Sequence, residues 1–164
     1  LNNFAHRTFN SVDAKQFVLS LKKIYLYNQS LEKAFAHGNN TYQRLVSFNK
    51  IFTHEFRFNR STKHVSNPEK GSAAKRLNMF LRWMVRKDNK GVAFGIWNTI
   101  KSSELYLPLD VHTGNIARKL GILNHKQNDW KALEEIMRIL KLFDKNDPVK
   151  YDFALFGLGA IEKF

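Results

Sequence analysis

The sequence predicts an all-α fold, and three observations support that prediction. Apolar residues recur at helical spacing in most segments of the chain. Residues that cap helix N-termini precede several of these segments, among them Asp110 and the pair Ser66 and Glu69, which has capping-box spacing. No run of alternating apolar and polar residues indicates a β-strand.

The first half of the chain is predicted to hold several helices and one loop. Helices are expected at Asp13–Tyr27, Ser30–His37, Tyr42–Phe56 and Pro68–Lys87, and a basic loop is expected at Arg57–Lys63. The pattern at Pro68–Lys87 is the strongest, because one face is apolar and the opposite face carries Lys75, Arg82 and Arg86. We therefore expect these cations to be exposed to solvent.

The second half begins with a turn-rich connection at Asp88–Gly95, followed by weaker helical fragments at Phe94–Ile100 and Ser103–Tyr106. Asp110 is a natural N-cap for a helix at Val111–Leu120, and Gly121 ends that helix. Further helices are expected at Asp129–Phe143 and Val149–Phe164.

The charge of the chain favours a polyanionic partner. The sequence has 27 Lys and Arg against 14 Asp and Glu, a net charge of +13 over 164 residues. A Lys or Arg that meets a nucleic-acid phosphate releases condensed counterions, and this release drives binding. A cationic surface with no dedicated partner is the alternative. The length fits one compact domain, or two small lobes that share a core.

The composition excludes several kinds of site. The chain has no cysteine, which excludes disulfides, thiolate zinc sites and cysteine-ligated iron–sulfur clusters. The six histidines do not have the spacing of metal ligands, so we expect no metal and no cofactor. No apolar run approaches the roughly 20 residues of a membrane span, so no membrane partner is expected.

Lys75 and Asp110 are the pair of residues that we single out for chemistry. Lys75 is expected near a helix N-terminus, where the helix dipole and neighbouring cations favour a nucleophilic free amine over the ammonium form. Asp110 is expected to cap a helix, where backbone N–H groups hold it ionised. Together they would supply a nucleophile and a carboxylate that handles protons. A solvated surface lysine and a simple helix cap are the alternatives.

The turn before Lys75 has the composition of a phosphate-binding turn. Gly71 permits close approach of the backbone, and free N–H groups at a helix start bind anions. The alternative for this stretch, His64–Lys75, is an ordinary helix cap.

Several segments resemble the helix-hairpin-helix DNA glycosylases. Gly71-Ser-Ala-Ala-Lys75 resembles their hairpin-to-helix segment, in which a glycine precedes the catalytic lysine by four positions. Leu107-Pro-Leu-Asp110-Val-His112 resembles the motif in which the catalytic Asp precedes a Val/Thr-His pair, and Tyr151–Gly159 resembles the closing helix. The segments His64–Arg86 and Pro148–Gly159 also resemble an uncharacterised bacterial family, the domain of unknown function 2400. The separation of Lys75 and Asp110 is similar to that in archaeal 8-oxoguanine glycosylases.

The resemblance implies a helix-hairpin-helix glycosylase-like helical bundle that forms a single unit over residues 1–164. Its hairpin and catalytic-type helix would cover about residues 64–87, and its closing helix about residues 149–163. The chain begins at Leu1 without an initiator Met, and the family's early helices have no counterpart in it. We therefore expect a truncated version of the two-lobed fold, with N-terminal sequence missing.

The resemblance also implies a function, that of a DNA-repair glycosylase with abasic-site lyase activity. Its substrate would be duplex DNA with a damaged base, such as an oxidised purine, that is flipped into a pocket. Lys75 and Asp110 would be catalytic. Contacts with DNA would come from Lys70, Gly71, Ser72, Ala73, Arg76 and His112, and the base pocket would include Asp152 and Phe156. For Asp152 and Phe156, a solvated acid and a core aromatic residue are equally good interpretations.

Two other functions stay open at this point. One is a non-catalytic helical DNA-binding module that keeps the glycosylase fold, and the other is a basic helical RNA-binding domain. The presence of both Lys75 and Asp110 favours the enzyme, because a binding module requires neither. We expect a cytoplasmic bacterial protein that associates with the nucleoid when bound to DNA.

Overall fold

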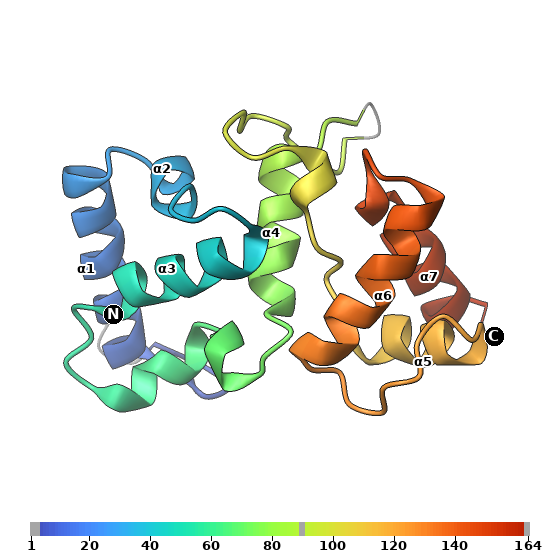
Figure 1. Ribbon diagram of the computed structural model, residues 1–164. Coiled ribbons are helices and arrows are strands. Elements are labelled where there is room, and N and C mark those ends of the chain that lie inside the picture. The colour runs from blue at the N-terminus through green and yellow to red at the C-terminus, as the bar shows by residue number, and fades with distance from the viewer. Residues whose placement is uncertain (1–3, 89–90, 163–164) are drawn as a thin grey trace. The chain divides into compact units, whose positions relative to one another are not determined.

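The computed structural model describes residues 4–88 and 91–162 (Figure 1). Its α-helices are α1 (Ser11–Tyr27), α2 (Leu31–Phe35), α3 (Thr41–Thr53), α4 (Lys75–Val85), α5 (Val111–Lys119), α6 (Trp130–Phe143) and α7 (Asp152–Ala160). Shorter 3₁₀ helices are η1 (Asn59–His64), η2 (Pro68–Lys70), η3 (Ser102–Glu104) and η4 (Pro148–Tyr151). Helices make up nearly all the regular structure of the described residues, which confirms the all-α class.

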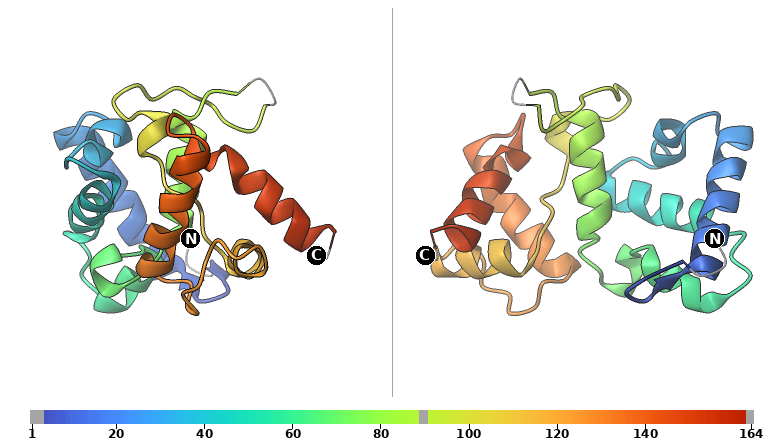
Figure 2. Two further views of the ribbon diagram at one scale, coloured as in Figure 1. Left: turned by 45° about the vertical axis from the view of Figure 1, so that its right-hand side comes forward. Right: turned by 180° about the vertical axis from the view of Figure 1, so that it is seen from behind.

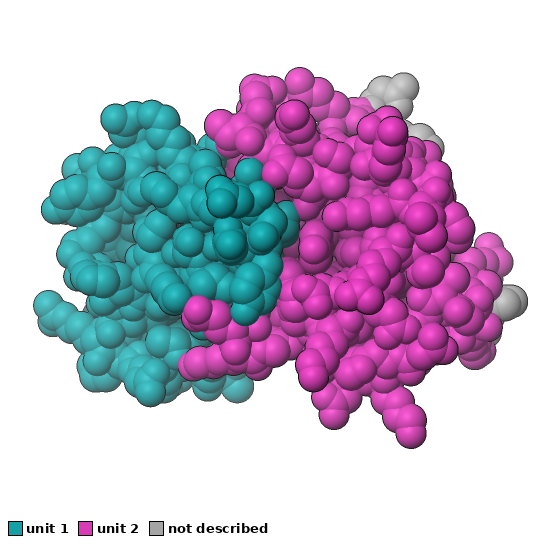
Figure 3. All heavy atoms as spheres, viewed as in Figure 1, with its two compact units in different colours: residues 1–67 teal, residues 68–164 magenta. Residues whose placement is uncertain are grey.

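The chain divides into two compact units, of which unit 1 ends at Asn67 and unit 2 begins at Pro68 (Figure 3). Each unit has its own set of buried apolar side chains. The expectation of a single unit with the helix-hairpin-helix glycosylase architecture stays a prediction.

Unit 1 has an aromatic core between α1, α2 and α3. The rings of Phe35 and Phe48 are stacked, with their centres 3.7 Å apart. The rings of Phe17 and Phe52 pack edge to face, with their centres 4.9 Å apart. Phe35 is fully buried. Stacked and edge-to-face ring pairs stabilise a fold by more than the burial of their apolar area alone. These rings therefore fix how α1 and α2 pack on α3.

A short antiparallel hairpin at the start of unit 1 is a structure that the sequence pattern misses. Its strands are β1 (Ala5–His6) and β2 (Phe9–Asn10), with Ala5 opposite Asn10. Strands of this length have no room for alternation of apolar and polar residues. Asn10 is also the N-cap of α1 and forms a capping box with Asp13, so the hairpin leads directly into the helix.

In unit 2, α6 confirms the helix predicted at Asp129–Phe143 and buries an apolar stripe. The buried side chains of this stripe are Trp130, Leu133, Ile136, Met137 and Leu140. Asp129 caps α6 by accepting a hydrogen bond from the Ala132 N–H. The last helical region is divided into η4 and α7, and α7 lies against α5 (Figure 2). Residue 163, the last of the predicted closing helix, lies outside the described residues.

The helix predicted at Pro68–Lys87 begins later than expected. Only Pro68–Lys70 is helical in the first part, as the 3₁₀ helix η2, and α4 starts at Lys75. Gly71 and Ala74 have positive φ angles between the two segments, and such a conformation interrupts a right-handed helix. The predicted capping box at Ser66 therefore does not mark the start of α4.

The helical fragment predicted at Phe94–Ile100 is also absent from the structure. Its backbone N–H groups bind the end of α4: those of Phe94 and Gly95 donate to the Trp83 carbonyl, and that of Trp97 donates to the Met84 carbonyl. The last carbonyls of a helix have no partner within the helix. Here the following segment satisfies them instead of coiling into a helix of its own.

Candidate active site

The turn before α4 sets the position of Lys75 at the start of that helix. Gly71 has a φ of +80°, in the left-handed region that favours glycine, and nothing lies within 4 Å of its Cβ position. Its backbone conformation, rather than a lack of space, therefore favours glycine. The Trp130 N–H donates to the Gly71 carbonyl at 2.8 Å, which fastens the turn to the start of α6.

The predicted phosphate-binding residues of this turn differ in their exposure. Lys70, Gly71 and Arg76 are exposed, Ser72 is half-buried, and Ala73 is buried. Ser72 Oγ already accepts a hydrogen bond from the Ala74 N–H at 3.1 Å. Lys70 in the turn and Arg76 at the start of α4 are therefore exposed cations that a phosphate can reach, whereas Ala73 offers only backbone atoms.

Lys75 and Asp110 lie in direct contact. Lys75 Nζ donates a hydrogen bond to Asp110 Oδ2 at 2.8 Å, although 35 residues separate them in the sequence. The side chain of Lys75 is 45% exposed and that of Asp110 is 13% exposed. Lys75 is the first residue of α4 and Asp110 is the N-cap of α5. The two helix starts thus hold an amine and a carboxylate within reach of proton transfer.

Asp110 is fixed by more than its contact with Lys75. Its Oδ1 accepts the Thr113 N–H at 2.9 Å, which confirms the predicted helix cap, and its carbonyl accepts Asn128 Nδ2 at 3.1 Å. Partial burial raises the pKa of Asp110, but the hydrogen bonds from Lys75 and the Thr113 N–H outweigh it, so the pKa lies below its ordinary value. Asp110 is therefore an anion at neutral pH.

A second ion pair lies in unit 2, and one of its members corrects a prediction. Arg82 was expected on an exposed face, but it is 2% exposed and its Nη1 donates to Asp152 Oδ2 at 2.7 Å. Burial raises the pKa of Asp152 to about 6, although Arg82 lowers it, and the charges of Asp110 and Lys75 also act on it. Asp152 is therefore not a solvated acid, and it is electrostatically coupled to the Lys75–Asp110 pair.

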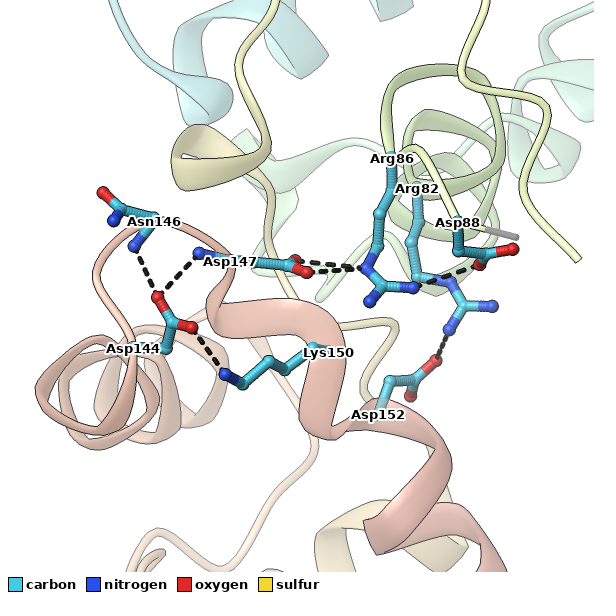
Figure 4. Close-up of polar contacts among 8 residues, drawn as sticks. All are labelled: Arg82, Arg86, Asp88, Asp144, Asn146, Asp147, Lys150 and Asp152. Atoms are coloured by element: carbon cyan, nitrogen blue, oxygen red, sulfur yellow. Dashed lines mark hydrogen bonds and ion pairs between the residues drawn. The ribbon is translucent and has the colours of Figure 1, made fainter. Parts of the chain in front are cut away.

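Further contacts extend this charged region along α4. Arg86 Nε donates to Asp147 Oδ2 at 2.9 Å and Arg86 Nη1 to Asp88 Oδ2 at 3.1 Å (Figure 4). The guanidinium carbon of Arg82 lies 4.3 Å from the centre of the Phe153 ring. Arg82 follows Lys75 by two helical turns, a spacing visible in the sequence, but nothing in the sequence pattern identifies Asp152 as its partner.

His112 and Phe156 come from α5 and α7, where these helices pack together. Their ring centres lie 6.0 Å apart in an edge-to-face arrangement. Phe156 is 41% exposed, so it is not a core aromatic residue. Gly159 allows the close packing, because a Cβ there would lie 2.8 Å from Ile116 Cγ1 and 3.3 Å from the His112 carbonyl.

The described part of the chain holds neither a cluster of metal-ligating side chains nor a membrane-spanning helix. Within residues 4–88 and 91–162, no group of three or more His, Asp or Glu side chains could hold a metal ion. In the same part of the chain, no helix is both long and apolar enough to cross a membrane.

Comparison with known proteins places the chain in a family but gives no function. No curated protein and no solved structure matches it. Residues 1–161, nearly the whole sequence, match the family described as protein of unknown function DUF2400. The chain belongs to this family.

Proposed function

We propose that this protein is a DNA glycosylase with abasic-site lyase activity, which acts on a damaged base such as an oxidised purine. The observation that carries the proposal is the 2.8 Å contact between Lys75 Nζ and Asp110 Oδ2. An amine and a carboxylate at two helix starts suit imine chemistry, which needs a nucleophilic amine and a group that moves its protons. The resemblance of the Gly71–Lys75 and Leu107–His112 segments to the glycosylase motifs supports the same assignment.

In this proposal, the unprotonated Lys75 amine attacks the sugar carbon C1′. The bond from Nζ to C1′ forms as the bond from C1′ to the base nitrogen breaks, and the base leaves with the bonding electron pair and takes up a proton from water. Asp110 accepts the proton that the attacking nitrogen loses. It gives this proton to the ring oxygen O4′ as the bond from C1′ to O4′ breaks, which leaves a protonated imine between Lys75 and C1′. The Asp110 carboxylate then takes a proton from C2′, and the bond from C3′ to oxygen breaks as the 3′ phosphate leaves with the electron pair.

The charge of Asp110 has a second use in this reaction. Departure of a base leaves positive charge on the sugar, and a fixed carboxylate stabilises such charge best where water is partly excluded. Asp110 has a lowered pKa, is largely buried, and is fixed by the Thr113 N–H. It therefore needs no reorganisation when the charge develops.

Binding of the DNA backbone is assigned to the turn before α4. Lys70 and Arg76 are exposed and flank Lys75 in the sequence, and backbone N–H groups at a helix start attract phosphate. The net charge of +13 supports a polyanionic substrate.

Borohydride trapping tests the proposal, because reduction of the imine joins protein and DNA covalently. We expect trapping on oligonucleotides that carry an abasic site or 8-oxoguanine, and we expect Lys75→Gln to abolish it. Lys131→Gln is the matched control, since Lys131 is an exposed lysine in the first turn of α6. Asp110→Asn should keep much of the cap but slow base removal, because the negative charge is lost.

The outcomes separate the enzyme from a binding module. Equal trapping by wild type and Lys75→Gln would show that another amine forms the imine, and would overturn the assignment of Lys75. Absence of trapping on every lesion, together with DNA binding that weakens as salt rises, would favour the non-catalytic DNA-binding module.

A further inference from the structure

The segment Arg57–His64 of unit 1, here called the basic turn, is more regular than its sequence predicts. Residues Arg57–Lys63 were predicted to be a basic loop, but residues Asn59–His64 form the 3₁₀ helix η1. Ser61 Oγ donates to Asp13 Oδ1 at 2.6 Å, and Gln16 Nε2 donates to Ser61 Oγ at 3.0 Å. Two polar side chains of α1 therefore hold the turn from inside the unit.

These anchoring side chains are buried, which makes them unusual. Asp13 is fully buried and Gln16 is 5% exposed. Burial raises the pKa of Asp13, but hydrogen bonds from Ser61 and the Asn10 N–H, with the charges of Arg60 and His64, lower it below its ordinary value. A buried carboxylate is costly even when it is paired, and an apolar residue would fill the same space at lower cost. What Asp13 and Gln16 provide is a fixed direction for the turn.

The fixed turn presents an aromatic ring among cations. Phe58 is 53% exposed, and Arg57 and Lys63 are exposed side chains with no hydrogen-bond or ion-pair partner in the described part of the chain. Arg60 Nη2 donates to the Thr8 carbonyl at 3.3 Å, which brings the turn of the β1–β2 hairpin alongside. No Asp or Glu occurs in residues 4–12 or 56–67, and Asp13 between them is buried.

We propose that unit 1 binds an unpaired nucleic-acid strand on the basic turn. Phe58 stacks on a base, and Arg57 and Lys63 contact the flanking phosphates. An exposed aromatic ring among cations suits this ligand, because every base has a face for stacking and every nucleotide has a phosphate. The rigid anchoring lowers the entropy lost on binding. This binding goes beyond the proposed function and holds whether or not Lys75 is a nucleophile.

The first test separates stacking from charge by using two polyanions with the full chain. One is an oligothymidylate strand, and the other is heparin, which has no bases. Phe58→Ala should weaken binding of the oligothymidylate by at least about fivefold, the lower limit for one base–aromatic stack, and leave heparin binding unchanged. Phe58→Tyr should restore binding of the strand. Tyr25→Ala is the control, because Tyr25 is 57% exposed on α1, and it should bind both polyanions as wild type does.

The second test examines the cations through salt dependence. The double variant Arg57→Gln, Lys63→Gln should make the slope of log affinity against log salt shallower by about 1.4 for the single strand, since each lost phosphate contact contributes about 0.7. The double variant Lys15→Gln, Lys22→Gln removes two exposed cations of α1 and is the control. All of these side chains are exposed, and melting curves should match that of the wild type.

Several outcomes would overturn the proposal. They are equal binding of the strand by Phe58→Ala and Tyr25→Ala, an equal loss of heparin binding in Phe58→Ala, and a salt slope that is the same in both double variants. Borohydride trapping in parallel keeps the two proposals distinguishable. Loss of strand binding in Phe58→Ala, combined with no trapping by any protein, would refute the glycosylase and leave the strand-binding site intact.

Discussion

Replacing Asp152 with Asn tests how the buried Arg82–Asp152 pair contributes to stability. Asp152 is 5% exposed, and burial raises its pKa from 3.8 to about 6, despite Arg82 at 2.7 Å. A group with a higher pKa in the folded state binds its proton more tightly there. Its contribution to stability is therefore fully present below pH 3.8 and is lost as the pH rises through about 6.

The size of the effect follows from the two pKa values of Asp152. With 3.8 in the unfolded chain and about 6 in the folded protein, this single group lowers the free energy of unfolding by about 2 kcal/mol between pH 4 and pH 7. Asp152→Asn cannot titrate at this position. The free energy of unfolding of the wild type, minus that of the variant, should therefore fall by about 2 kcal/mol over this interval.

Urea denaturation followed by tryptophan fluorescence measures this difference in the free energy of unfolding for unit 2. The three tryptophans, Trp83, Trp97 and Trp130, all belong to unit 2, so their emission reports the unfolding of the unit that contains Asp152. Linear extrapolation gives the free energy of unfolding at each pH. A change in midpoint with a constant slope identifies a change of stability.

Asp144→Asn is a control of opposite sign. Hydrogen bonds from Lys150, and from the N–H groups of Asn146 and Asp147, lower the pKa of Asp144 to about 2 (Figure 4). Its contribution to stability is therefore present above the unfolded pKa and is lost as the pH falls. The difference between wild type and Asp144→Asn should rise, not fall, as the pH is increased from 2 to 4.

A flat or rising difference for Asp152→Asn between pH 4 and pH 7 would refute this reasoning. It would mean that attraction between Asp152 and Arg82 outweighs the loss of hydration on burial. The pair would then stabilise unit 2 most at neutral pH, and Asp152 would be an ordinary salt-bridge carboxylate.

Two further predictions concern packing. Gly157→Ala should stabilise α7 by about 1 kcal/mol, because nothing lies within 4 Å of its Cβ position and alanine favours a helix. Gly159→Ala should lose this gain, because its Cβ would lie 2.8 Å from Ile116 Cγ1. Thermal melting of the two variants compares them directly. Phe35→Ala should destabilise unit 1 by about 3–5 kcal/mol, because Phe35 is fully buried and stacked on Phe48; a loss below 1 kcal/mol in far-UV circular dichroism melts would contradict this packing.

The elements that the sequence predicts well are those with local signals at their ends. Asp110 accepts a backbone N–H at the start of α5, as predicted, and Asp129 does the same at the start of α6, where the predicted helix begins. Gly121 has a φ of +70° just after α5, where a glycine was expected to end the helix. In each case, the residues that define the helix boundary lie within a few positions of one another in the sequence. The local sequence pattern therefore predicts the boundary.

The start of α4 was predicted wrongly because two local signals conflict there. Pro68 suits the first turn of a helix, and it does begin the 3₁₀ helix η2. Gly71 and Ala74 then take left-handed conformations, and the sequence pattern does not reveal the one at alanine. The result matters for the site, because it makes Lys75 the first residue of α4, whereas the prediction places it in the second turn.

Arg82 was wrongly assigned to an exposed face, and the reason is physical. Periodicity places a polar residue on the surface because it compares that residue only with its neighbours in the helix. Arg82 is buried with Asp152, which pairs with it from 70 residues away in the sequence. Asp13 is likewise buried with a distant partner, Ser61, 48 residues away. Neither partner can be identified from the sequence of the helix that carries the buried charge.

The buried charges Arg82 and Asp13 each lie in the same unit as one of the two proposed sites. A buried charge is retained only where its partners satisfy it, and apolar packing would stabilise the fold at lower cost. Arg82 joins α7 to the helix that starts at Lys75, and Asp13 joins α1 to the turn that presents Phe58. In unit 2 a buried ion pair holds the helix that begins with Lys75. In unit 1 a buried hydrogen-bonded pair holds the turn that carries Phe58. Buried charges of this kind are expected where structure serves function, and this expectation agrees with the proposals made for Lys75 and Phe58.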